Sequence, residues 1–143
     1  MQDLAQHAAN HTAMHFAKGG FTVKLVPLTF EGATETDALA RMSIDKTFTG
    51  DLIATSKGQM LSASTTTTGS AGYVAIERVE GCLQGRTGSF VLQHTGTMNR
   101  GEPTLSISVV PDSGTGELTG LAGSFKIIRA DGKHSYELNY SLP

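Results

Sequence analysis

Several polar side chains in this sequence stand in phase with apolar ones, at the two-residue spacing that places residues on one face of a β-strand. If the apolar faces line an enclosed interior, these polar groups are carried inside with them. Burying ionisable groups is costly unless they pair, so such a cluster would have altered proton affinities and could bind or transform a polar ligand. The candidate lumen residues are Lys46, Glu77, His94, His134 and Tyr136.

The strand around Glu77 has two possible inward faces. Glu77 is in phase with Ala75, whereas its neighbour Arg78 is in phase with Ile76. Both phases are apolar, so the alternation leaves open which of the two charged residues faces the interior.

The same side chains also have a purely structural interpretation. Lys46 and His134 can lie in solvent at strand ends, and His94 can be a hydrogen-bonded residue of the core. Clusters of titratable groups mark functional sites only in a statistical sense, so both interpretations stay open.

Other patterns in the chain favour neither a metal nor a cofactor. His7, His11 and His15 are four residues apart, as on one face of a helix, but a zinc site also needs an ordered shell of partners. Cys82 is the single cysteine, which excludes a cysteine-based metal cage. The segment 110–114 resembles an aspartic protease signature, yet Pro-Asp-Ser-Gly is an ordinary turn sequence. We therefore expect no metal and no cofactor.

The composition predicts one domain that binds neither nucleic acid nor a membrane. A length of 143 residues suits a single domain, and a net charge of −2 lacks the basic surface that a phosphate backbone requires. No stretch approaches the roughly 18 apolar residues of a membrane-spanning helix. The first 20 residues lack the apolar core of a signal peptide, so we expect a cytoplasmic protein.

Alternation of apolar and polar residues continues to the C-terminus and predicts eight strands. Turns rich in Gly, Asn and Asp follow one another at intervals of roughly ten residues, which leaves no room for the crossover helices of a parallel sheet. Open sheet edges invite aggregation, and glycines relieve the bends of a closed sheet. We predict an all-β fold, a small eight-stranded antiparallel up-and-down barrel, with a sandwich as the alternative. The predicted strands are 21–25, 42–48, 51–61, 73–79, 88–97, 105–109, 124–130 and 136–142.

Two segments fall outside this pattern. Residues 1–13 are rich in Ala, Gln and His and are predicted to form an N-terminal extension, helical or mobile, before a barrel domain at 14–143. Residues 62–70 contain four consecutive threonines between Ser and Gly residues, which indicates a flexible loop at a barrel mouth.

The segments 69–79 (GSAGYVAIERV), 88–98 (GSFVLQHTGTM) and 109–116 (VVPDSGTG) together resemble an uncharacterised bacterial family of small β-barrel proteins. The fold of that family is similar to plant allene oxide cyclase. The Gly-Thr-Gly stretch at 114–116 also resembles one found in the cyclases and the dirigent proteins. The resemblance covers about residues 14–143 and implies an eight-stranded, allene oxide cyclase-like barrel that forms homo-oligomers. It implies no assigned activity, because a shared fold does not confer function.

Three roles fit these observations. The first is binding of a small apolar ligand, because an eight-stranded barrel can hold one small ligand in its lumen. The second is a cyclase- or isomerase-like enzyme on an apolar substrate, with Glu77 as acid/base or charge stabiliser and His94 as its partner. The third is a structural homo-oligomer, because residues 73–76 are apolar on both faces of one strand, which a monomeric barrel cannot bury.

Overall fold

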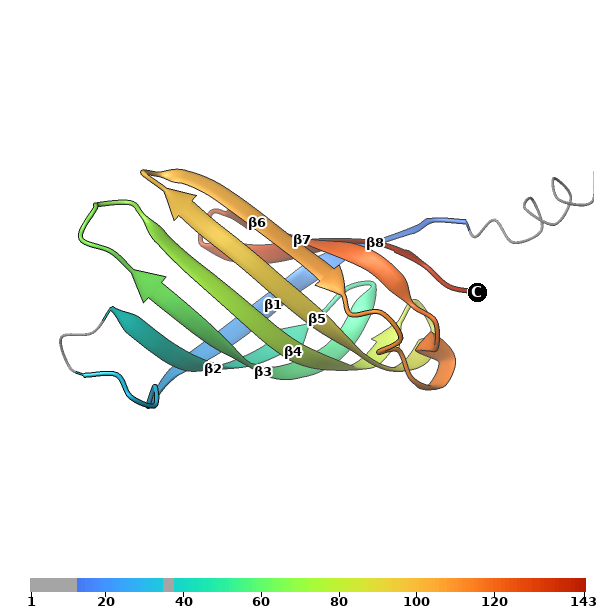
Figure 1. Cartoon of the computed structure of the whole chain (residues 1–143). Coiled ribbons are helices and arrows are strands. Elements are labelled where there is room, and N and C mark those ends of the chain that lie inside the picture. The colour runs from blue at the N-terminus through green and yellow to red at the C-terminus, as the bar shows by residue number, and fades with distance from the viewer. Residues whose placement is uncertain (1–12, 35–37) are drawn as a thin grey trace, which may run out of the picture.

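Eight antiparallel strands close into one barrel in the computed structural model, which describes residues 13–34 and 38–143. Each strand pairs with the next along the chain, and β8 pairs with β1 to complete the ring (Figure 1). This confirms the predicted all-β, up-and-down barrel. The elements are β1 (His15–Leu28), β2 (Leu39–Phe48), β3 (Leu52–Ser64), β4 (Ala71–Leu83), β5 (Arg86–Asn99), β6 (Glu102–Val109), the short 3-10 helix η1 (Gly116–Leu118), β7 (Ala122–Ala130) and β8 (Lys133–Ser141).

Most strands extend beyond the ranges that the alternation predicts. Residues 62–64, expected in a loop, belong to β3, and residues 65–70 form the β3–β4 connection. The hydroxyl of Thr65 organises this connection: it donates to the carbonyl of Ser70 at 3.0 Å and accepts from the amide of Thr67 at 3.2 Å. The expected extension at 1–13 falls almost wholly outside the described residues. Within the described residues, no helix is long and apolar enough to cross a membrane.

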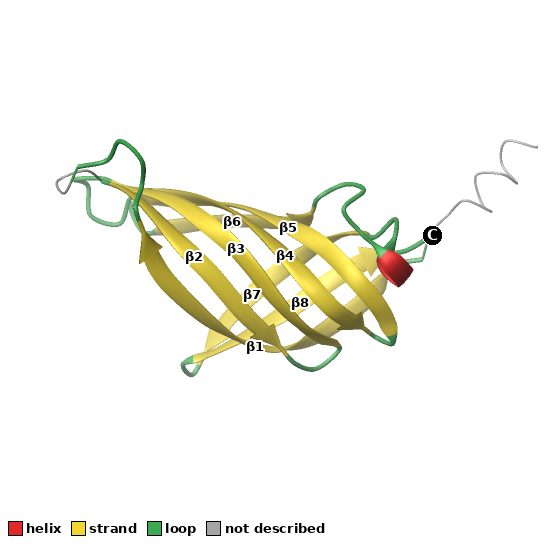
Figure 2. Ribbon diagram, turned by 90° about the horizontal axis from the view of Figure 1, so that it is seen from below, coloured by secondary structure: helices red, strands yellow, loops and turns green. Residues whose placement is uncertain are grey.

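One half of the barrel is filled by large side chains. The ring of Tyr136 stacks on Phe125, with centroids 5.5 Å apart, and meets the edge of Phe48 at 5.7 Å. The segment around η1 lies at this end of the barrel (Figure 2), where Leu118 and Leu121 are fully buried. Burial of each such side chain contributes about 1.5–3 kcal/mol to stability.

The opposite half of the barrel is open. Leu25 and Leu105 share the inward phase of buried residues farther down their strands, yet they are 44% and 48% exposed. The barrel wall extends least far toward the open end beside the β7–β8 turn. Pairing between β8 and β1 stops at the pair Phe21–His134, although β1 continues to Leu28. β6 and β7 pair at two positions, Ile107–Phe125 and Ser108–Ser124. The part of each strand nearer the open end lies beyond this pairing.

Candidate functional site

Glu77 lies at the centre of a buried polar cluster inside the barrel. Its Oε1 accepts a hydrogen bond from the Ser56 hydroxyl at 2.8 Å, and its Oε2 accepts from Lys46 Nζ at 2.8 Å and from His94 Nε2 at 2.6 Å. Glu77 is 0% exposed, His94 3% and Lys46 7%. Arg78 is exposed on the outer face of β4, so Glu77 is the residue that faces inward.

The four side chains of this cluster come from four consecutive strands, β2 to β5. Lys46 on β2 and Glu77 on β4 meet across the inner face of β3, where Gly58 lies opposite Glu77. A Cβ at Gly58 would stand 2.1 Å from the carbonyl oxygen of Ile76 and 2.6 Å from the Cα of Glu77. The absence of a side chain at Gly58 therefore lets β3 lie this close to the backbone of β4 at Ile76 and Glu77.

The cluster keeps the Glu77 carboxyl group ionised. Burial alone raises the pKa of Glu77, but the hydrogen bond from His94 and the charge of Lys46 outweigh it and lower the pKa to about 2. A carboxylate only accepts hydrogen bonds, so Nε2 of His94 must carry a proton. Both Glu77 oxygens are occupied by donors from the protein, so Glu77 acts through its partners.

Tyr73 extends the cluster toward the open half of the barrel. Its hydroxyl lies 3.3 Å from Nδ1 of His94. Because Nε2 of His94 donates to Glu77, a neutral His94 accepts a hydrogen bond from Tyr73 at Nδ1, and a protonated His94 donates one to it. Burial, followed by the negative charge of Glu77, raises the pKa of Tyr73, and the positive charge of Arg129 opposes this rise.

A cavity of about 190 Å³ lies on the open side of the cluster. Its polar lining comes from Lys46, Tyr73, His94, Arg129 and His134. Its apolar lining comes from Phe21, Val23, Leu25, Ile44, Met60 and Ile127. A mainly apolar hollow with a few converging polar groups is the usual form of a small-molecule site.

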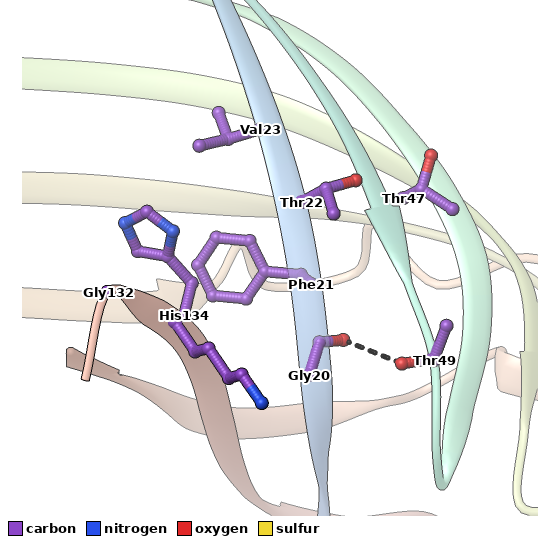
Figure 3. Close-up of a pocket in the computed structure, with 9 residues that line it drawn as sticks. Gly20, Phe21, Thr22, Val23, Thr47, Thr49, Gly132 and His134 are labelled. Atoms are coloured by element: carbon purple, nitrogen blue, oxygen red, sulfur yellow. Dashed lines mark hydrogen bonds between the residues drawn. The ribbon is translucent and has the colours of Figure 1, made fainter. Parts of the chain in front are cut away.

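Phe21 and His134 separate this cavity from a groove on the outside of β1. Their rings stack with centroids 5.1 Å apart, and Figure 3 shows them side by side near Val23. The outer groove, about 490 Å³, is lined by both residues and by Thr22 and Thr47. It is larger than the inner cavity but touches none of the Glu77 cluster, so we place the candidate site in the lumen.

The structure brings together four of the five candidate residues. Lys46, His94 and His134 line the cavity, and Glu77 lies directly behind it. Tyr136 is instead a core residue of the filled half and is absent from the cavity lining. Its hydroxyl accepts from the amide of Leu52 and donates to the carbonyl of Thr49, both at 2.8 Å.

Three residues of the site are not among the sequence candidates. Ser56, Tyr73 and Arg129 each lie in the inward phase of their strands, and Tyr73 is in phase with Glu77 itself. The signal for Arg129 is its two-residue spacing from Ile127, another residue that lines the cavity.

The remaining motifs take no part in this site. Among the described residues, no three His, Cys, Asp or Glu side chains are grouped to hold a metal ion. His7 and His11 lie outside the described residues, and His15 belongs to β1. Cys82 is a free thiol. Asp112 has a positive φ of 62°, as the turn interpretation of its segment requires.

Comparison with known proteins finds relatives whose activity is not assigned. A family model described as "Protein of unknown function (DUF3224)" matches residues 17–140, a span that contains every residue of the site. A crystal structure of a protein with unknown function from this family, from Shewanella oneidensis MR-1, is 51% identical and superimposes with a TM-score of 0.86. The match covers 92% of this chain and 99% of that one. No curated protein matches the chain.

Proposed function

This chain belongs to the DUF3224 family. We propose that it binds a small, largely apolar molecule in the open half of its barrel. The observation that carries the proposal is the cavity of about 190 Å³ between the filled half of the barrel and its open end. An apolar cavity of about 150 Å³ in another protein is large enough to bind benzene, so this one suits a ligand of about one ring. The apolar walls favour the body of such a ligand, and the polar groups orient it.

The test uses phenylacetamide, a neutral one-ring probe, with the 15N-labelled protein observed by NMR. Ile127→Trp places a larger side chain in the cavity and should block the probe. Ile128→Trp is the matched control, because Ile128 is the next residue of β7 and points to the other side of the barrel wall.

We expect saturable shifts of amides around the cavity in the wild-type protein and in Ile128→Trp, and a loss of binding in Ile127→Trp. Saturable shifts that persist unchanged in a folded Ile127→Trp would contradict binding in the lumen. The complete absence of shifts at millimolar probe would contradict the proposal as well.

A second candidate function is proton transfer, as in an isomerase or cyclase that acts on an apolar substrate. The chain of contacts from Glu77 through His94 to Tyr73 supports it, because it ends on a hydroxyl at the cavity. Because three donors surround the Glu77 carboxylate, Glu77 is better suited to stabilise charge than to transfer a proton itself. Tyr73 and His94 would transfer the proton. Deuterium exchange at the CH₂ of phenylacetone should then be faster with the wild-type protein than with Tyr73→Phe. A rate equal to that in buffer would count against the enzyme.

The third candidate, a homo-oligomer, is supported by the outer face of β3 and β4. Leu61, Val74 and Ile76 are exposed there, and a groove of about 580 Å³ runs between them. Arg41 also lines this groove. A cytoplasmic location and an allene oxide cyclase-like form of the barrel stay predictions.

Light scattering tests this third candidate. Ile76→Lys should lower the mass of an oligomer, whereas Ile53→Lys should not, because Ile53 is an exposed outward residue at the other end of β3. A monomeric mass for the wild-type protein at micromolar concentration would contradict the oligomer.

A further inference from the structure

The open half of the lumen carries more positive than negative charge. Among the described residues that line the cavity or lie directly behind it, Glu77 is the single carboxylate, and its charge is balanced by Lys46 at 2.8 Å. Arg129 adds a second full positive charge, and none of the described carboxylates lies within ion-pair distance of it. The cavity therefore carries one positive charge that none of its described carboxylates balances, whether its two histidines are neutral or protonated.

Arg129 stands where a ligand can reach it from solvent. It lies opposite His134 near the β7–β8 turn, where the barrel wall is lowest, and it is exposed. From there it lines the same cavity as Val23, Ile44 and Met60, which are apolar. A molecule in this cavity thus meets apolar walls along its body and a guanidinium group at its outer end.

We propose that the ligand of this cavity is a small amphiphilic anion, an apolar body of about one ring that carries a carboxylate held by Arg129. This inference rests on the proposed function and specifies its ligand class. A guanidinium group suits the role because its planar fork of N–H donors matches a carboxylate in two parallel hydrogen bonds.

Tyr73 offers a second donor for the same head group. When His94 is protonated, its Nδ1 donates to the Tyr73 oxygen, and the Tyr73 proton is then free to point into the cavity. Tyr73 and Arg129 line the same cavity, and the positive charge of Arg129 opposes the rise in the pKa of Tyr73. Glu77 and Lys46 remain paired behind His94 and do not compete for the ligand.

The experiment compares three probes of one shape: phenylacetate, neutral phenylacetamide and cationic phenethylamine. Each is titrated into the 15N-labelled full-length protein, into Arg129→Gln and into Arg78→Gln. Arg78 is the matched control because it is exposed on the outer face of β4, away from the cavity.

We expect the wild-type protein to bind phenylacetate about tenfold more tightly than phenylacetamide, and phenethylamine most weakly. Arg129→Gln should remove the preference for phenylacetate over phenylacetamide, so that the ratio of the two affinities falls from about tenfold to about one. Arg78→Gln should keep the preference.

The outcomes separate this inference from the function on which it rests. Equal affinity of wild type for phenylacetate and phenylacetamide in the lumen would overturn the anionic ligand and keep the binding function. Loss of affinity for all three probes in a folded Arg129→Gln would likewise overturn it, because Arg129 would then support the wall and not a carboxylate. Binding of none of the probes by the wild-type protein would overturn both.

Discussion

Nζ of Lys46 and Oε2 of Glu77 lie 2.8 Å apart inside the barrel, although β3 separates the strands that carry them. The rings of Phe21 and Phe48 lie 5.1 Å and 5.9 Å from the same Nζ, so the ammonium group is surrounded by aromatic side chains and the carboxylate. This ion pair lies at the inner end of the cavity, next to the filled half of the barrel. It also fixes the proton of His94 on Nε2, which leaves Nδ1 to face Tyr73.

Substitution of Glu77 by glutamine should destabilise the protein strongly. Glu77→Gln leaves the ammonium group of Lys46 buried without its counter-charge, and removal of one partner from a buried pair costs about 3–5 kcal/mol. Urea denaturation should show this loss in the free energy of unfolding.

The matched control for this substitution is Glu80→Gln, on the exposed outer face of β4, which should change the free energy of unfolding by less than about 0.5 kcal/mol. The double variant Lys46→Met with Glu77→Gln should recover part of the loss, because no unpaired ammonium group remains. A Glu77→Gln protein as stable as Glu80→Gln would show that the pair does not contribute to folding.

The stabilising effect of Glu77 should disappear in acid. Its pKa is about 2 in the folded protein, below the ordinary value of 4.5, so the folded state favours the ionised form. A lowered pKa gives stability that is fully present above about pH 4.5 and is lost as the pH falls toward 2, at most about 3 kcal/mol.

This pH dependence is measured as the difference in unfolding free energy between wild type and Glu77→Gln. The comparison cancels the other carboxyl groups. The difference should shrink between pH 4.5 and pH 2. A difference that is constant down to pH 2.5 would contradict the ionised, paired state of Glu77.

Because β3 lies so close to β4 at Gly58, the addition of one methyl group there should destabilise the protein severely. Gly58→Ala puts a Cβ within 2.1 Å of the Ile76 carbonyl oxygen, so the strands must separate, at a cost of about 1–3 kcal/mol or more. Gly72→Ala is the matched control on β4, since its Cβ would meet nothing nearer than 3.8 Å. Equal thermal stability of the two variants would contradict the close approach of β3 to β4 at Gly58.

Tyr136 should contribute to stability and not to binding. Tyr136→Phe removes the acceptor of the Leu52 amide in the filled half, and an unsatisfied buried donor costs about 1–3 kcal/mol. The affinity for phenylacetamide should stay that of wild type. A tenfold loss of affinity with unchanged stability would place Tyr136 in the binding site after all.

Alternation along the strands was enough to predict the barrel and the inward placement of Lys46 and His94, because a period of two assigns residues to faces without knowledge of partners. It did not separate Glu77 from Arg78, because the outer face of β4 is itself apolar at Val74 and Ile76. Nor does the period tell which end of the lumen is filled.

The placement of Tyr136 in the filled half has the same origin. The residue does face inward, but the backbone groups that bind its hydroxyl belong to the β2–β3 region, far from it along the chain. Arg129 is not among the sequence candidates for the opposite reason. A charged residue at a strand end is normally solvated, whereas here the barrel wall is short, so Arg129 is exposed to solvent and also lines the cavity.

The most direct test of ligand binding in the lumen is the set of intermolecular NOEs between phenylacetamide and assigned methyl groups. Binding in the lumen predicts NOEs from the ring protons to methyl groups of Ile44, Met60 and Ile127, which line the cavity. NOEs confined to Val74 and Ile76 on the outer face would contradict it, and would move the binding surface to the outside of the barrel.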